Sequence, residues 1–354
     1  MNVRRSSFVV RRSDLATVVG FVAVVAALWL AGGWRVLPGA FPDEQALQRE
    51  MPLRATAARL WNNVRWQLTG STPPTVVRGR DGWWFYASEQ AQDGHSLDEM
   101  DGRVAPAAEE PAWAEAIRAR GKRHSSYLVV VPPDKHLVEQ KHLPFKPAIG
   151  PHGTRLNRLE LAVGRGTMLN LTGAVAGGYP RSDSHWLDEG AYQGYLAIHR
   201  RLGLAAPLPR TAFTALPYDW PGDLWALRMA GPTHERVELW QAVAPLPAHW
   251  LDGGPVAKPG LFHLPAAQAA WAVGPSGARE VVTIVDDPTL PTAVVFHDSF
   301  MPALLPYLSQ HFRRVRYVWC HYLQPVVDAE QPDVVIHENV SRNVQWLGKV
   351  SDVP

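Results

Sequence analysis

Two short segments, far apart in this sequence, carry side chains that could together form a hydrolytic site. The first contains Asp183 and His185, and the second contains Ser299. A serine hydroxyl is a weak nucleophile at neutral pH and needs a neighbouring base. An imidazole can act as that base when a carboxylate fixes its tautomer and stabilises the imidazolium. We therefore predict a triad of Ser299, His185 and Asp183, which requires the fold to join the two segments.

Ser299 follows the apolar run 292–296 and precedes Pro302, so it lies where a buried strand would turn into a helix. This placement directs backbone N–H groups and the positive end of the helix toward anything bound beside the hydroxyl. We therefore take the Ser299 N–H as the leading oxyanion-hole donor. The alternative is that Ser299 only caps the helix, since serine is a favoured cap. Asp298 is either a second carboxylate of the site or a residue that stabilises the turn.

A metal site is the competing interpretation of Asp183 and His185. Asp-x-His could supply two ligands of a metal ion, and His297 could supply a third. Catalytic metal sites usually combine three protein ligands with water, and no further spaced cluster of His and Asp is evident in the sequence. We therefore favour the serine triad, and expect neither a metal nor a cofactor.

Alternating helical patterns and apolar runs predict an α/β fold with a mostly parallel sheet. Apolar runs predict strands at 126–131, 167–171, 292–296, 315–319 and 333–337. Helices are expected at 110–120, at 155–163, between the Asp183/His185 loop and Gly203, and after Pro302. Ligands of such sheets gather at the carboxyl ends of the strands. Lys135, in the loop after the 126–131 run, is therefore a candidate neighbour of the site.

The sequence between residues 81 and 290 predicts three further features. Asp81-Gly82 predicts a tight turn that enters an aromatic strand. Either Asp188 or Ser184 should cap the helix that ends at Gly203. The stretch 204–290 is rich in proline and poor in periodicity, which predicts an irregular insertion beside the sheet with short antiparallel strands. Within it, 235–240 and 280–285 are the strand candidates.

The N-terminus predicts a membrane anchor. Residues 15–31 are apolar apart from Thr17 and Gly20, and four arginines precede them. A helix of this length spans about 26 Å, close to the hydrocarbon thickness of a bilayer. Since positive flanks stay in the cytoplasm, the rest of the chain should lie outside it. A signal peptide cleaved near 31–33 is the alternative.

These features divide the chain into four parts. They are a basic cytoplasmic tail (1–14), a transmembrane signal anchor (15–33), a linker with a helix (34–75) and a catalytic domain (76–350). The 354 residues are 46% hydrophobic and 19% charged, so a sizeable core can be buried. A net charge of only +2, without a long basic run beyond the N-terminus, argues against nucleic acid as a partner. The single cysteine, Cys320, rules out an intramolecular disulfide and suits a buried strand end.

Six segments resemble, in the same order, the SGNH-hydrolase-like family of bacterial exopolysaccharide O-acetyltransferases, the alginate-type AlgJ and AlgX proteins. They are 81–86 (Asp-Gly-Trp-Trp-Phe-Tyr), 132–135 (Pro-Pro-Asp-Lys), 183–186 (Asp-Ser-His-Trp), 222–224 (Gly-Asp-Leu), 297–300 (His-Asp-Ser-Phe) and 332–336 (Pro-Asp-Val-Val-Ile). The resemblance implies an SGNH-like three-layer α/β/α fold, with Ser299 as nucleophile, His185 as base and Asp183 as its orienting acid. The chain departs from many SGNH enzymes at His297, where they carry glycine.

The resemblance also implies partners. It suggests a periplasmic domain at the inner membrane that receives acetyl groups through a membrane-bound O-acyltransferase, together with other envelope proteins of polysaccharide assembly. The acceptor would be an exopolysaccharide. Residues that could support the substrate or the oxyanion are Asp298, His297, Lys135 and Arg342. Two alternatives stay open: a periplasmic carbohydrate acetylesterase with the same triad, and a non-catalytic scaffold subunit that binds polysaccharide.

Overall fold

A computed structural model describes residues 76–86, 106–146, 153–224, 234–251, 256, 272–274 and 276–349 of the chain. The predicted anchor at 15–33 and the linker at 34–75 lie outside these residues, so both stay predictions. Within the described part of the chain, no helix combines the length and the apolar character needed to cross a bilayer.

The main sheet has eight strands, most of them parallel. Its parallel part has the order β4 (Met168–Asn170), β3 (Tyr127–Val131), β12 (Val334–Glu338), β10 (Thr292–Phe296) and β11 (Arg314–Trp319). Three antiparallel strands extend it beyond β11, namely β9 (Arg279–Ile284), β7 (His249–Trp250) and β8 (Ala272–Val273). The predicted α/β class and mostly parallel sheet are thus confirmed. Buried Val, Ile and Phe side chains on both faces explain why the sequence shows continuous apolar runs there.

Helices cover both faces of this sheet, because successive side chains of each strand point to opposite sides. On one face, Val295 and Ile336 share a core with α8 (Asp188–Leu202) and α11 (Met301–Leu308). On the other, Val294 and Val335 pack against a second helical layer. That layer consists of α5 (Glu110–Arg123), α7 (Arg155–Val163), α12 (Gln324–Glu330) and the 3-10 segment η6 (Ser341–Gly348).

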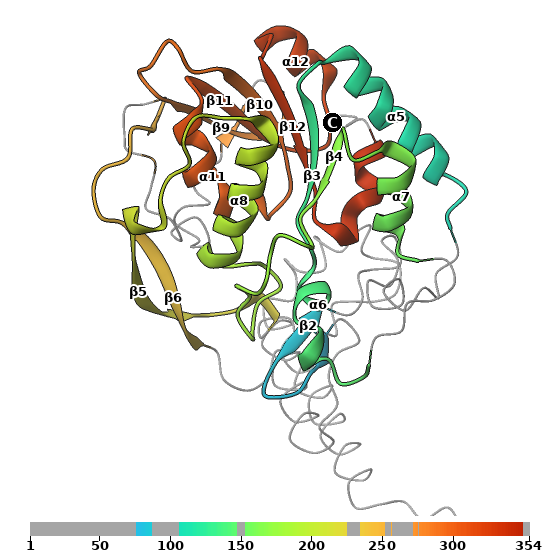
Figure 1. Cartoon of the computed structure of the whole chain (residues 1–354), viewed down its shortest axis with the longest axis vertical. Helices are drawn as coiled ribbons and strands as arrows, with labels where there is room; N and C mark the ends of the chain where they lie inside the picture. Colours follow the sequence, from blue (N-terminus) through green and yellow to red (C-terminus); the bar gives the residue numbers. More distant parts are fainter. Residues whose placement is uncertain are drawn as a thin grey trace, which may run out of the picture.

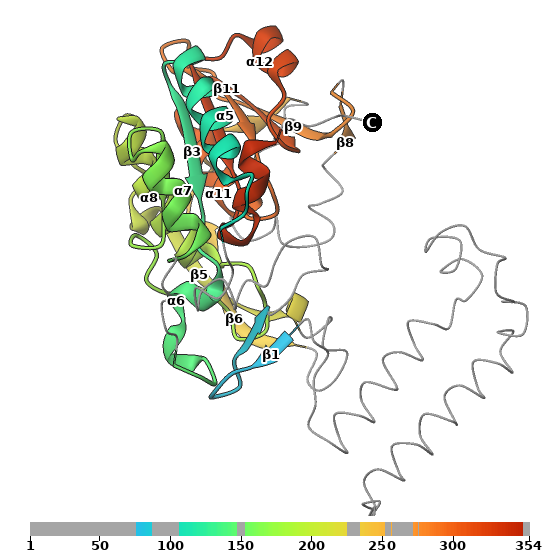
Figure 2. The same ribbon diagram turned by 90° about the vertical axis from the view of Figure 1, so that its right-hand side faces the viewer.

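Smaller elements gather at the carboxyl end of the parallel strands, which is the lower end of the sheet in Figure 1. They are the hairpin of β1 (Val76–Arg78) and β2 (Trp84–Tyr86), the helix α6 (Lys135–Val138), and the hairpin of β5 (Phe213–Trp220) and β6 (Glu235–Ala242). The view turned by 90° places them at the same end (Figure 2). Short 3-10 turns are η2 (Gln140–His142), η3 (Arg210–Ala212) and η5 (Ser309–His311).

Local predictions were mostly correct, with one error at a helix start. Asp81 and Gly82 turn the β1–β2 hairpin with φ angles of 54° and 78°, and Gly203 ends α8 with a φ of 62°. The predicted cap of α8 is wrong, because Leu187 occupies that position without a side-chain hydrogen bond. Asp188 instead accepts the Trp240 N–H at 2.8 Å from inside the first turn. This contact with β6 is long-range and overrides the local capping preference.

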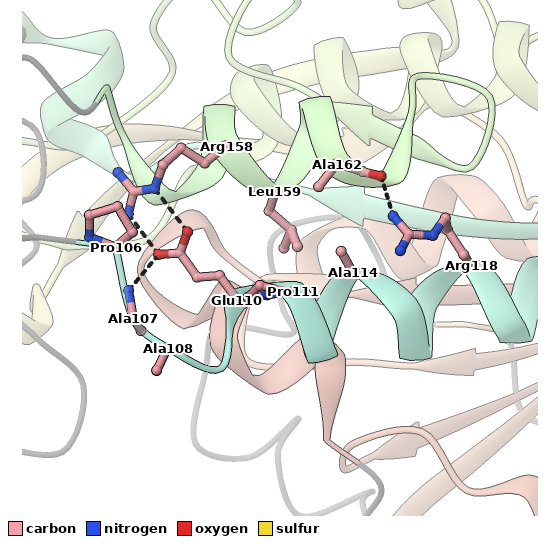
Figure 3. A pocket seen from close by; sticks show the side chains of 10 residues that line it. All are labelled: Pro106, Ala107, Ala108, Glu110, Pro111, Ala114, Arg118, Arg158, Leu159 and Ala162. Atoms are coloured by element: carbon pink, nitrogen blue, oxygen red, sulfur yellow. Dashed lines mark hydrogen bonds and ion pairs between the residues drawn. The ribbon is translucent and has the colours of Figure 1, made fainter.

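A groove lies between α5 and α7, and Figure 3 shows the residues that line it. An ion pair of 2.7 Å between Arg158 and Glu110 joins the two helices at one end of the groove, and Arg118 donates to the Ala162 carbonyl at 2.5 Å toward the other. Much of the remaining lining is small and apolar. None of the predicted site residues lines it.

The central strand β12 should dominate stability. Ile336 is 0% exposed there, so Ile336→Ala leaves a cavity and should lower the free energy of unfolding by roughly 2–5 kcal/mol. Leu161→Ala is the matched control, because Leu161 is 84% exposed and its truncation should change the free energy by less than about 0.5 kcal/mol. Denaturant titration measures both. Equal losses for the two variants would contradict this account of the core.

Candidate active site

Folding brings the three predicted residues into one hydrogen-bonded line. Asp183 Oδ1 lies 2.9 Å from His185 Nδ1, and His185 Nε2 lies 2.8 Å from Ser299 Oγ. Since a carboxylate can only accept, Nδ1 carries the proton toward Asp183 and Nε2 is left to accept from the serine hydroxyl. This is the geometry that a serine nucleophile and its base require.

Ser299 lies in the turn that links the end of β10 to the start of α11, and its neighbour Asp298 holds this turn. The buried Asp298 carboxylate accepts the Phe300 N–H at 2.9 Å and the Val340 N–H, from the segment after β12, also at 2.9 Å. Phe300 occupies the cap position of α11, so Ser299 is not its cap. Asp298 therefore stabilises the turn, and the Ser299 hydroxyl is available to His185.

The loop that carries Asp183 is held by donors from two directions. Asp183 Oδ2 accepts the indole N–H of Trp220 at 2.9 Å and the backbone N–H of Asp223 at 3.0 Å. From α6, the Lys135 ammonium donates to the carbonyls of Arg181 at 2.8 Å and Asp183 at 3.0 Å. Burial alone would raise the pKa of Asp183, but hydrogen bonds and the charge of His185 hold it well below its ordinary value.

A second carboxylate approaches the same imidazole nitrogen. Asp223 Oδ2 lies 3.4 Å from His185 Nδ1 and accepts the Ser184 hydroxyl at 2.5 Å. Burial lowers the pKa of His185, yet the hydrogen bonds and charges of Asp183 and Asp223 outweigh it and raise this pKa above its ordinary value. The site therefore favours the imidazolium that forms when serine loses its proton.

The competing metal interpretation involves a different third group from the one expected. Possible ligand atoms of Asp183, His185 and Asp223 lie within 4.8 Å of one another. His297 is not among them: its Nδ1 bonds the Asp298 carbonyl at 2.7 Å, and its ring packs 5.5 Å from that of Trp319. The carboxylate oxygens already accept N–H and O–H donors, and Nε2 faces a hydroxyl. This donor pattern suits a hydrogen-bonded triad better than a cation.

The remaining candidates, Lys135 and Arg342, contact the segments that carry the triad. Lys135 is 3% exposed, and burial lowers its pKa to about 7 although neighbouring acids, first Asp183, oppose the shift. Its ammonium holds backbone carbonyls, which makes it a support of the Asp183 loop. Arg342 forms an ion pair with the buried Asp134 and lies 5.4 Å from the ring centroid of Phe300, the residue after Ser299. It therefore braces the residue that follows the nucleophile.

Sequence reasoning gave no role to four residues of the site. Trp220 and Asp223 lie in the stretch without periodicity, and only the Gly-Asp-Leu resemblance pointed to the second. Gly222 between them has a φ of +53°, and a Cβ there would lie 2.3 Å from the Ser182 hydroxyl oxygen. Glu338, fully buried at the end of β12, accepts the Asp298 N–H at 3.2 Å. Burial and then the Asp298 charge raise the pKa of Glu338 well above its ordinary value.

Comparison with known families agrees with this fold. A family model described as an SGNH hydrolase-like domain, acetyltransferase AlgX, matches residues 76–278, which is more than half of the chain. The chain therefore belongs to this family of SGNH hydrolase-like domains. No curated protein sequence matches it.

Solved structures share the fold at low sequence identity. A DHHW family protein from Eubacterium siraeum has a TM-score of 0.51 and 14% identity, over 78% of this chain and 97% of that chain. PatB1 from Bacillus cereus has a TM-score of 0.50 and 15% identity, over 76% of this chain and 96% of that chain. At such identities the likeness concerns the fold alone.

The indole of Trp220 should matter for its hydrogen bond to a buried anion. Trp220→Phe keeps most of the ring packing but removes the indole N–H that donates to Asp183. The free energy of unfolding should therefore fall by roughly 1.5–3 kcal/mol near neutral pH. Tyr218→Phe, in the same hairpin, should change it by less than about 0.5 kcal/mol. Chemical denaturation of the two variants tests this. A Trp220→Phe protein as stable as wild type would mean that Asp183 does not depend on this donor.

Proposed function

We propose that the protein is an O-acetyltransferase in which Ser299 carries acetyl, as an ester, to a hydroxyl of an exopolysaccharide. The observation that supports this most directly is the hydrogen-bonded line of Asp183, His185 and Ser299 at 2.9 and 2.8 Å. Membership of a family described as acetyltransferases supports the reaction class. Only the resemblance supports a polysaccharide as acceptor.

In the first half-reaction, the Ser299 oxygen attacks the acetyl carbonyl carbon of the donor. His185 Nε2 takes the hydroxyl proton, and Asp183 stabilises the resulting imidazolium. Collapse of the tetrahedral intermediate breaks the bond to the leaving group, which receives the proton from Nε2. Acetyl is then an ester on Ser299.

In the second half-reaction, a sugar hydroxyl attacks that ester while Nε2 removes its proton. The proton returns to the Ser299 oxygen as the acetylated sugar leaves, so atoms and charge balance. Each intermediate carries an oxyanion that needs fixed donors. Among the described residues, the Ser299 N–H donates to no acceptor, and it lies just before the N-terminus of α11. It is the donor that we assign to the oxyanion.

The same chemistry with water as acceptor would make the protein an acetylesterase, and a protein that only binds polysaccharide would be a scaffold. We favour transfer because of the family description. We further propose that the reaction takes place outside the cytoplasm, with the chain anchored by residues 15–33 and with acetyl supplied through a membrane-bound acyltransferase. The basic and apolar N-terminal sequence supports this location.

Substitution of the triad tests the chemistry. Ser299→Ala and His185→Ala should each lower acetyl transfer from an acetyl ester to an oligosaccharide by at least about 1000-fold, and Asp183→Asn by about 100- to 10000-fold through the wrong tautomer. Ser125→Ala, an exposed serine, should leave the rate unchanged. A serine-directed sulfonyl fluoride should label Ser299 in the wild type but not in His185→Ala.

Three outcomes separate the alternatives. Ester loss that oligosaccharide does not accelerate, without acetylated sugar, identifies an esterase. Full transfer by Ser299→Ala excludes Ser299 as nucleophile. A wild type that neither reacts with the ester nor labels, yet binds the oligosaccharide, is a scaffold. Circular dichroism of each variant shows whether a loss of activity is a loss of fold.

The pH dependence should reflect the raised pKa of His185. Because only the neutral imidazole can accept the serine proton, acylation of Ser299 should increase as pH rises through this pKa. The rising limb of the single-turnover rate should therefore lie above the ordinary histidine value of about 6.5. Rapid-quench measurement of ester loss across neutral and alkaline pH checks this. A rising limb centred below about pH 6 would show that the two carboxylates do not act on His185 in this way.

A further inference from the structure

We propose that Asp223 is a second positioning carboxylate for His185, which acts on Nδ1 across space and through the side chain of Ser184. The inference rests on the proposed function, because it concerns the base of the same triad. It adds a residue that neither the sequence pattern nor the family description assigns.

Geometry carries this inference. Asp183 and Asp223 both approach Nδ1, with carboxylate oxygens at 2.9 and 3.4 Å. Ser184 holds the Asp223 carboxylate: it donates its hydroxyl to Asp223 Oδ2 at 2.5 Å and its backbone N–H to Asp223 Oδ1 at 2.6 Å. The Ser184 oxygen also lies 3.4 Å from Nδ1. Since its proton is committed to Asp223, its lone pairs can face the Nδ1 proton.

Asp183 and Asp223 have different surroundings, and therefore different roles toward His185. Asp183 is 7% exposed, and its oxygens accept from the His185 side chain and backbone, the Trp220 indole and the Asp223 backbone. It therefore fixes the tautomer and the ring orientation. Asp223 is 34% exposed and lies farther from Nδ1. Its backbone keeps Asp183 in place, and its carboxylate adds negative charge beside the ring.

The charged groups around the imidazole determine how removal of the Asp223 charge should change the pKa of His185. The carboxylates of Asp183 and Asp223 face Nδ1. Lys135 and Glu235 bond the backbone of residues 181 and 183 and do not contact the ring through these bonds. On another side of the ring lies the uncharged Phe300, with centroids 5.0 Å apart. Asp223 is therefore the partly exposed carboxylate whose charge directly favours the imidazolium. Its neutralisation should make His185 a weaker base with a lower pKa.

The test uses Asp223→Asn in the full chain, since asparagine keeps the shape and removes the charge. We expect the rising limb of the pH–rate profile to move down by about one pH unit, and the plateau rate to fall roughly tenfold. Ser184→Ala removes the bridging hydroxyl and should give a smaller shift in the same direction. Asp219→Asn is the matched control, because this aspartate is 68% exposed and pairs with Arg236 at 3.0 Å. It should keep the wild-type profile.

A second measurement does not depend on turnover. The histidine NMR titration of wild type and Asp223→Asn, with His185→Ala to assign the signal, should show the same downward shift of the His185 pKa. An unchanged titration midpoint and pH limb in folded Asp223→Asn would overturn the role of Asp223 and leave the acetyltransferase proposal intact. An inactive wild type whose His185 midpoint still responds to Asp223→Asn would overturn the function and leave the positioning. If Asp223→Asn does not fold, Ser184→Ala decides: a wild-type midpoint there overturns the inference.

Discussion

The hydrogen bond of 2.8 Å between His185 and Ser299 depends on where parallel strands end. Strands β3, β10 and β12 run in the same direction, so the segments after them meet at one edge of the sheet. The segment after β10 presents Ser299, and the segment after β12 holds its turn through Val340. From the segment after β3, Lys135 reaches the loop that carries His185. A shared strand direction is thus the condition for the site.

Burial sets the electrostatics of that edge. An ionised carboxylate as buried as Asp183 would be unstable without donors, and the loop supplies them from Trp220, from the Asp223 backbone and from His185. These donors keep the acid ionised, and the ionised acid in turn favours the imidazolium. Burial and the nearby Asp298 charge also raise the pKa of Glu338, which lies behind the nucleophile turn, well above its ordinary value. The pKa values of Asp183 and Glu338 are thus shifted in opposite directions by their surroundings.

The sequence predicted the parts that follow local rules. Strands such as 292–296 and the turn at Gly82 were predictable from short-range sequence patterns. Ser299 and His185 were predictable because a serine nucleophile needs a base. Trp220 and Asp223 could not be assigned in this way, because their roles arise from contacts made only after the β5–β6 hairpin meets the carboxyl edge. The cap of α8 was wrong for a related reason: its candidates, Asp188 and Ser184, are both engaged by distant partners.

The two halves of the site are stabilised mostly by different residues. Asp298 joins the Ser299 turn to the chain after β12. Trp220 and Lys135 hold the loop that carries Asp183. Since the halves share few partners, substitutions in one should add to those in the other for stability, while activity needs both. Two contacts couple the halves: His185 Nε2 lies 2.8 Å from Ser299 Oγ, and the Trp186 indole N–H donates to the Phe300 carbonyl at 3.1 Å. The first places the base on the nucleophile, and the second holds the two segments in that register.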